Sequence, residues 1–244
     1  MKYNYKEFNK DSKLTPIIIL HGWGGSLNSL NPLAENLSKS VKNRIFNLEL
    51  SGFGSTPVSK DVMNTSDYAN FVYDFLKEKN IKKYILVGHS FGGKTSIALT
   101  LKHSEMIEKL ILVNSSGIKP KNSAKRKFFK VLISLVPTKV KDIGFLKKIF
   151  YKKIVRENDY LNSGKLSKSL SKIVSEHFDK ELNHIQTPTL IIWSEKDKAV
   201  PLWMGEFLNS EIKTSKFIVV KDKTHGLPLT NPEIVSDIIT EFLN

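Results

Sequence analysis

The stretch YILVGHSFGGKTS, residues 84–96, decides the fold because an apolar run stops abruptly at a turn rich in glycine. The run 84–88 has the length and composition of a strand buried on both faces. Ser90 stands alone between Gly88 and Gly92, and a helical pattern follows. A sharp strand-to-helix turn strains its central residue and needs glycine where the backbone comes close. The stretch therefore predicts a turn that holds up a nucleophilic serine, or else a tight connection alone.

Similar apolar runs recur along the chain, with amphipathic helical patterns between them. Two of these helical patterns cover 66–79, with Ser66 as the expected N-cap, and the C-terminal segment, with Pro232 in its first turn. The runs cover residues 16–20, 44–50, 84–88, 109–114, 189–194 and 216–220. This alternation predicts the α/β class, with a mostly parallel central sheet and helices on both of its faces.

Residues 118–183 interrupt that alternation. They contain lysine-rich amphipathic stretches and no clear strand pattern. Because strand and helix alternate again from Thr189, the segment is interpreted as a helical cap inserted into a single core. The predicted domains are therefore a core of residues 1–117 and 184–244 and a cap of residues 118–183.

The chain is strongly basic, with a formal net charge of +14 over 244 residues. Only three of its 38 basic residues are arginine, the side chain that best reads phosphates and guanine edges. Residues 119–181 contain 17 Lys or Arg and 6 Asp or Glu, and so carry +11 of that charge. We interpret this as solvated lysine-rich helix faces and expect no specific nucleic-acid partner.

Composition also limits the compartment and the cofactors. The longest apolar stretches are too short to span a bilayer, and the N-terminus has no apolar leader. The chain has no cysteine, which excludes disulfides and thiolate metal sites. The segment GWGGSL lacks the third glycine of a dinucleotide fingerprint, and GHSFGGKTS lacks the spacer of a phosphate loop. We expect a cytoplasmic protein without a metal, a cofactor or a membrane span.

A serine nucleophile needs a general base, and the chain has six histidines. His225 is the preferred candidate because it lies in a loop directly after the last expected strand, where parallel sheets place functional groups. His89 is adjacent to Ser90 and is expected to point elsewhere. The others lie in another motif, at a helix end or in and near the expected cap: His21, His103, His177 and His184.

The acid that orients such a base is expected from another loop at a strand end. The segment TLIIWSEKDKAVP supplies Glu195 and Asp197. Asp197 is preferred because it lies deeper in the loop, ahead of a Val-Pro pair that stiffens the turn. Glu195 is the reserve candidate and Asp222 a more distant one.

A second glycine-rich loop, LHGWGGS at residues 20–26, follows the first strong strand. Its glycines allow the backbone N–H of Trp23 to turn toward the nucleophile. The N–H of Phe91, at the start of the helix after Ser90, is the other expected donor. Together they predict an oxyanion hole.

Four segments in this order resemble the α/β-hydrolase superfamily: HGWGG at 21–25, GHSFGG at 88–93, SEKDKAVP with Asp197, and DKTHG with His225. The segment LELSGFGSTP is similar to the family's D-x-P-G-x-G-x-S loop, with Glu49 and Ser51 where Asp and Pro are common. The family's N-terminal hairpin is shortened here to KYNYKEF, which predicts a trimmed sheet edge.

The resemblance implies that Ser90 attacks an acyl carbon, His225 relays the proton and Asp197 holds the imidazole. It implies a serine hydrolase acting on carboxylic esters of small or medium acyl compounds. Thioester, lactone or C–C bond cleavage would use the same residues, and a ligand receptor or regulator on this scaffold is the alternative of another class. A serine nucleophile argues against the haloalkane dehalogenases and epoxide hydrolases of this fold, which use aspartate. The oligomeric state is left open.

The expected cap contributes large apolar residues, some of which should line an acyl pocket: Phe128, Phe129, Leu132, Phe145, Phe150 and Tyr151.

Overall fold

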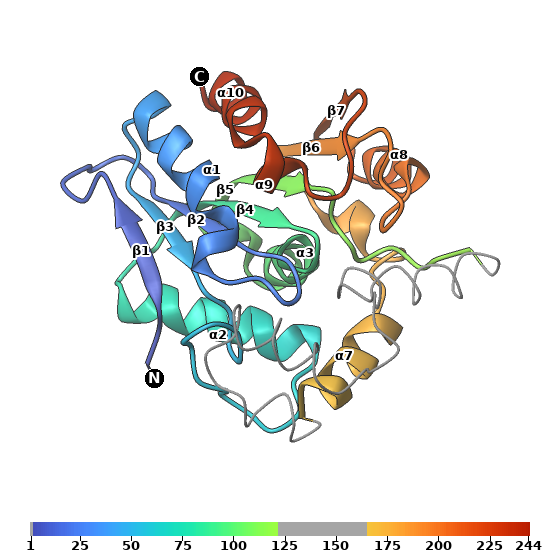
Figure 1. Cartoon of the computed structure of the whole chain (residues 1–244), viewed down its shortest axis with the longest axis horizontal. Helices are drawn as coiled ribbons and strands as arrows, with labels where there is room; N and C mark the ends of the chain where they lie inside the picture. Colours follow the sequence, from blue (N-terminus) through green and yellow to red (C-terminus); the bar gives the residue numbers. More distant parts are fainter. Residues whose placement is uncertain (1, 122–164) are drawn as a thin grey trace, which may run out of the picture.

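Seven strands form one sheet in the computed structural model, which describes residues 2–121 and 165–244 (Figure 1). The strands are β1 (Tyr5–Phe8), β2 (Ile17–Leu20), β3 (Ile45–Leu48), β4 (Tyr84–His89), β5 (Ile107–Val113), β6 (Thr189–Ser194) and β7 (Ser215–Val220). Their order across the sheet is β1-β3-β2-β4-β5-β6-β7. β1 runs antiparallel to β3, and every other pair is parallel. This confirms the mostly parallel α/β sheet, and the single short strand β1 forms the trimmed edge.

The helices occupy the connections that the apolar periodicity indicated. They are α1 (Leu27–Ser40), α2 (Thr65–Glu78), α3 (Phe91–His103), α7 (Lys165–Ser175), α8 (Leu202–Glu211), α9 (Leu227–Thr230) and α10 (Pro232–Leu243), with 3-10 turns η1 (Ser104–Met106) and η2 (Leu182–His184). α10 begins at Pro232, as predicted. The N-cap of α2 is Asn64, two residues before the expected Ser66, and the Asn64 side chain accepts the Asp67 N–H at 2.8 Å. Ser66 is therefore not the cap.

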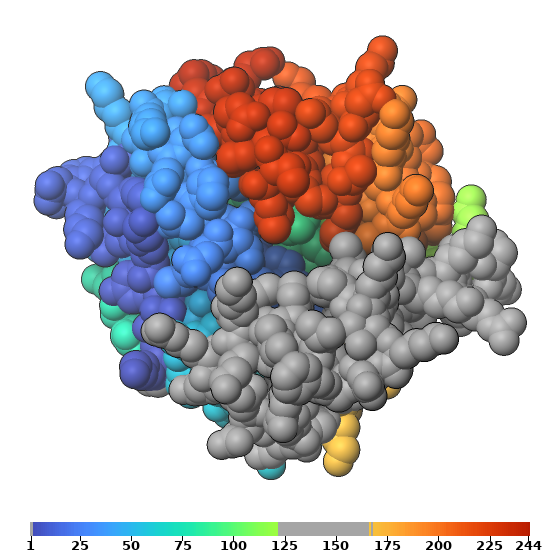
Figure 2. All heavy atoms as spheres, in the orientation of Figure 1, coloured from blue at the N-terminus to red at the C-terminus, as the bar shows by residue number. Residues whose placement is uncertain are grey.

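Alternate residues of each buried strand face opposite layers of helices. On one face Ile17, Ile19 and their neighbours in the sheet pack against α1, α9 and α10. On the other, Ile18, Leu20 and their neighbours pack against α2, α3 and α8. α1 and α10 are adjacent although they lie at opposite ends of the chain, and Figure 2 shows their surfaces side by side in light blue and red. Helices thus shield both faces of the sheet from water, as the near-continuous apolar runs of the strands require.

The insertion lies between β5 and β6, where the sequence places the cap. Its described part includes α7, which lies beside α2 (Figure 1). Residues 122–164 lie outside the described residues, and with them all six apolar side chains expected to face the acyl pocket. The division into core and cap stays a prediction.

Within residues 2–121 and 165–244, no helix has the length and apolar character needed to cross a membrane.

α8 packs directly on the indole of Trp193, the last apolar residue of β6. Trp193 is fully buried, and its Nε1–H donates to the Val200 carbonyl at 2.9 Å. A Cβ placed on Gly205 of α8 would lie 2.6 Å from Trp193 Cδ2. Because the indole is fully buried and bonded through Nε1, it cannot shift freely to make room for an added methyl group.

We predict that Gly205→Ala lowers the free energy of unfolding by about 1–3 kcal/mol because it overpacks this contact. Intrinsic helix propensity alone would raise the free energy of unfolding of the alanine variant by about 1 kcal/mol. We expect a decrease because the overpacking outweighs that gain. Urea unfolding measures the difference, with Ser210→Ala on the exposed side of α8 as the control. A more stable Gly205→Ala protein would contradict the packing argument.

Candidate active site

Ser90 lies at the turn between β4 and α3 with a backbone conformation that is rare for a residue with a side chain. Its φ is 53° and its ψ is −112°. Such positive-φ conformations cost free energy and persist where the surrounding structure enforces them. The Ser90 N–H donates to Val113 O at 3.1 Å and its carbonyl accepts the Ser116 N–H at 3.0 Å. β5 and its following loop thus hold the strained turn from one side.

The three glycines around Ser90 are needed for close approach. A Cβ on Gly92 would lie 2.2 Å from Leu20 O, and one on Gly88 would lie 2.5 Å from Gly92 O. A Cβ on Gly93 would lie 2.3 Å from Ser115 Oγ. This is the crowding that the G-x-S-x-G spacing predicted.

The structure brings Ser90, His225 and Asp197 together from three loops at the carboxyl end of the sheet. The distance from His225 Nε2 to Ser90 Oγ is 3.0 Å, and that from His225 Nδ1 to Asp197 Oδ2 is 2.7 Å. The carboxylate only accepts, so Nδ1 carries the proton and Nε2 is left to accept from the serine hydroxyl. This is the relay geometry of a nucleophile, a base and an orienting acid.

The Asp197 side chain is fully buried and accepts four hydrogen bonds. Its Oδ1 accepts the N–H groups of Ala199 at 2.7 Å and Val200 at 2.9 Å, and its Oδ2 accepts from His225 and from Asn114 Nδ2. These four donors satisfy both oxygens of a carboxyl group that is shielded from water.

Asn114 was not singled out from the sequence, although it ends the run 109–114. It has a φ of 45°, and its Oδ1 accepts the Ser194 hydroxyl at 3.1 Å. A polar residue that tolerates positive φ, placed directly after a buried strand, was the signal that could have identified it.

The reserve acids lie elsewhere. Glu195 Oε2 accepts the backbone N–H of Asp222 at 2.9 Å, and Asp222 pairs with Lys196 at the surface. Neither carboxylate contacts His225 in the described structure.

The loop 20–26 is fixed by two buried side chains. His21 donates from Nδ1 to Gly22 O at 2.8 Å and accepts the Leu50 N–H on Nε2 at 3.0 Å. Burial lowers the pKa of His21, which keeps the neutral form that these two bonds require. Glu49 accepts the N–H groups of Leu27, Ser55 and Thr56, at 3.1, 2.6 and 3.0 Å. Glu49, which stands where the family commonly has aspartate, thus connects the start of α1 with the loop that follows β3.

The rings of Trp23 and Phe91 contact each other edge to face, with centroids 5.2 Å apart, and both residues line the pocket onto which Ser90 opens. Phe91 is the first residue of α3, where backbone N–H groups have no partner within the helix. Their roles as oxyanion donors stay predictions.

The pocket encloses about 560 Å³, part of it open to solvent. Ser90 and His225 line one side. Most other lining residues are apolar, namely Ile118, Leu170, Ile173, Val174, Ala199 and Val200. Three of these come from α7, so the described part of the insertion forms a wall of the pocket. No group of three or more His, Asp or Glu side chains within the described ranges is placed to hold a metal ion.

Comparisons with known proteins identify the fold that carries these residues. A family model described as "alpha/beta hydrolase fold" matches residues 15–132. The enol-lactonase of Burkholderia xenovorans LB400 superposes with a TM-score of 0.80 at 17% identity, covering 99% of this chain and 96% of that one. The chain belongs to the α/β-hydrolase superfamily.

The sequences of two relatives align with most of this α/β-hydrolase. A protein of Haemophilus influenzae named "Putative esterase/lipase" is 22% identical over 100% of this chain and 88% of its own length. The 2-hydroxy-6-oxononadienedioate/2-hydroxy-6-oxononatrienedioate hydrolase of Escherichia coli K12 is 24% identical over 93% of this chain and 86% of its own. The names of these two relatives thus include an esterase/lipase and a dienedioate/trienedioate hydrolase.

His89 does not point away from the site of this hydrolase, contrary to the expectation from sequence. Its Nε2–H donates to the backbone carbonyl of His225 at 3.0 Å, and the two rings are 5.0 Å apart. On its other side it faces the loop 20–26: a Cβ on Gly22 would lie 3.3 Å from His89 Nδ1. His89 therefore ties the loop that carries His225 to the turn that carries Ser90.

We predict that His89→Leu lowers kcat about tenfold with little change in KM, because the loss of one positioning hydrogen bond costs about 1.4 kcal/mol. His89→Gln should retain activity within about threefold, since its amide N–H can reach the same carbonyl. Steady-state kinetics on both variants, after matching their unfolding free energies, tests the bond. Equal losses in both variants would mean that the donor does not matter.

Burial lowers the pKa of His89 from the ordinary 6.5 to about 3. Between these values the unfolded chain binds more protons than the folded one, so stability decreases as pH falls from 6.5 toward 3. We predict that His89→Gln makes this decrease shallower, by up to about 1.4 kcal/mol per pH unit. Urea unfolding of wild type and variant at several pH values between 7 and 4 measures it, and parallel curves would contradict the prediction.

Proposed function

We propose that this α/β-hydrolase is a serine hydrolase that cleaves carboxylic esters of small to medium acyl compounds through an acyl-enzyme on Ser90. The observation that carries the proposal is the unbroken relay from buried Asp197 through His225 to the hydroxyl of Ser90, at 2.7 and 3.0 Å. That relay opens onto a mainly apolar pocket. A strained turn that costs stability is well explained by the need to present this hydroxyl.

In the acylation step, Ser90 Oγ attacks the ester carbonyl carbon while its proton passes to His225 Nε2. The C=O electron pair moves onto the carbonyl oxygen and forms a tetrahedral oxyanion. We infer that the backbone N–H groups of Trp23 and Phe91 stabilise this charge. When the intermediate collapses, the leaving alcohol takes the proton from His225 and the acyl group stays on Ser90.

In the deacylation step, a water molecule gives a proton to His225 Nε2 and attacks the acyl carbon. Collapse of the second tetrahedral intermediate returns the proton to Ser90 Oγ and releases the acid. Asp197 remains ionised throughout and stabilises the imidazolium that forms twice in each cycle. Its four hydrogen-bond donors support that role.

C–C bond hydrolysis is the second candidate, and one specific observation favours it. The Escherichia coli relative named above as a dienedioate hydrolase matches nearly the whole chain. The same three side chains would serve that reaction, because it too needs an activated oxygen nucleophile and a proton relay.

We predict that Ser90→Ala lowers kcat on p-nitrophenyl esters of graded acyl length by on the order of a millionfold, as removal of a serine nucleophile does in the best-studied protease. A fluorophosphonate should label the wild-type protein at Ser90 and leave the variant unlabelled. Ser40→Ala, at the exposed end of α1, is the matched control and should keep full activity.

Activity that survives Ser90→Ala would overturn the assignment of the nucleophile. Labelling of Ser90 without turnover of any ester would instead favour the C–C candidate, which a vinylogous diketone substrate then tests.

A further inference from the structure

Lys94 lies one helical turn after Ser90 on α3. Side chains four residues apart share a helix face, and a helical side chain leans toward the N-terminus of its helix. Lys94 is therefore directed toward the end of α3 that carries Ser90. It lines the same pocket as Ser90 and His225 and is only 3% exposed. The sequence alone suggests an ordinary helix lysine, and the structure shows a buried one.

The ammonium of Lys94 reaches across to the last turn of α7 and to the residue that follows it. It donates to the carbonyl oxygens of Ile173 and Glu176, and Ile173 itself lines the pocket. A cation suits the carbonyls at a helix C-terminus. These two bonds explain how Lys94 is held, but they leave one of its three N–H donors without a partner in the described structure.

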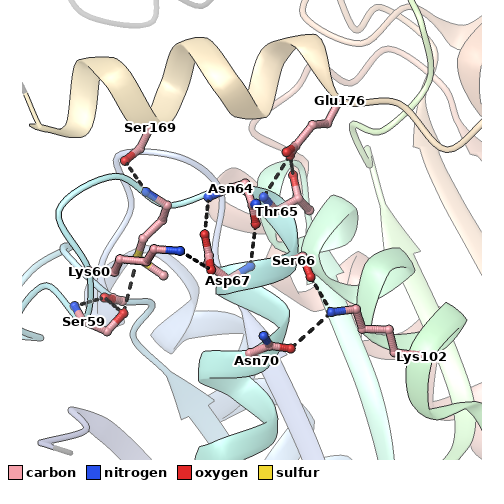
Figure 3. A network of polar contacts seen from close by, with 12 residues as sticks. Ser59, Lys60, Asn64, Thr65, Ser66, Asp67, Asn70, Lys102, Ser169 and Glu176 are labelled. Atoms are coloured by element: carbon pink, nitrogen blue, oxygen red, sulfur yellow. Dashed lines mark hydrogen bonds and ion pairs between the residues drawn. The ribbon is translucent and has the colours of Figure 1, made fainter.

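The charge of Lys94 is not neutralised by a direct ion pair among the described residues. The two carboxylates whose charges act on it, Glu176 and Asp179, make their hydrogen bonds to other groups. Glu176 accepts the N–H and the hydroxyl of Thr65 at the start of α2 (Figure 3), and Asp179 accepts the backbone N–H of Lys119. Burial without such a pair lowers the pKa of Lys94 to about 8.

Lys94 is also the only lysine or arginine among the described residues that line this pocket. A buried cation beside apolar side chains is costly unless an anion accompanies it. A carboxylate on a bound molecule would supply that anion and accept the remaining N–H.

We propose that Lys94 is a specificity-determining residue that binds a carboxylate on the acyl part of the substrate, so that the preferred substrates are half-esters of dicarboxylic acids. The inference rests on the proposed ester hydrolysis and names its substrate class. The substrate enters with its ester carbonyl at Ser90 and its anionic end beside the last turn of α7. No covalent step changes, since Lys94 only donates a hydrogen bond.

The test compares two substrates of equal length that differ in charge. One substrate is the monoethyl ester of a dicarboxylic acid, whose other end is a free carboxylate. The other is the same ethyl ester with a neutral carboxamide in place of that carboxylate. Both are compared for the succinate, glutarate and adipate series. Wild type should prefer the half-ester at one length by about tenfold or more in kcat/KM, as a charge-assisted hydrogen bond provides. Lys94→Gln keeps amide donors for the two α7 carbonyls but removes the charge, so the preference should fall about ten- to hundredfold. Lys94→Arg should keep most of it.

Lys102→Gln is the matched control, because Lys102 lies on the same helix at the surface, where it contacts Ser66 and Asn70 (Figure 3). It should leave the preference unchanged. A wild-type protein that prefers the amide ester at every length overturns the proposal, whatever the folding of the variants. So does a preference that Lys94→Gln leaves intact.

A binding measurement separates this proposal from that of ester hydrolysis. In the Ser90→Ala background, glutarate and its homologues should raise Tm, and Lys94→Gln in the same background should abolish the shift. If wild type cleaves neither ester but the Tm shift depends on Lys94, ester hydrolysis fails and the carboxylate site stands. If both esters are cleaved equally and no diacid shifts Tm, the carboxylate site fails alone.

Discussion

The closeness of the backbone around Ser90 is the constraint on which the rest of the site depends. β4, the start of α3 and the end of β2 approach one another so closely that no side chain fits at Gly88 or Gly92. The end of β2 continues into the loop of Trp23, so this approach also sets how near that loop comes to Ser90. Tight packing at a few points in the middle of the sheet thus determines the relative positions of loops distant in sequence.

Much of this arrangement could be predicted because it is encoded locally. Buried parallel strands need continuous apolar runs, and a sharp turn needs glycines at fixed offsets, so both leave signals within a few residues. The proximity of Asp197 to His225 could be predicted because its position after a strand fixes where it emerges. Asn114 and His89 were missed because their roles depend on partners more than 80 and 130 residues away in the chain. The positions of such partners follow only from the folded sheet.

The buried histidines have different roles because their surroundings differ. His21 and His89 lie in dry surroundings that lower their pKa and keep them neutral, and each uses its fixed N–H to hold a loop in place. His225 differs because it faces the carboxylate of Asp197 and retains some exposure to the pocket. Only this ring has both a stabilising anion and access to a substrate. Environment alone therefore separates the two histidines that hold loops in place from the one proposed to transfer protons.

The attachment of α7 has a consequence for how this molecule diversifies. α7 forms one wall of the pocket, and the polar contacts of α7 and the adjoining Glu176 that hold this wall run to Met63, Thr65 and Lys94. Substitutions at Leu170, Ile173 or Val174 would remodel the wall while the proton relay keeps its geometry. Inherited changes in the insertion can therefore create new preferences step by step, without passing through an inactive ancestor.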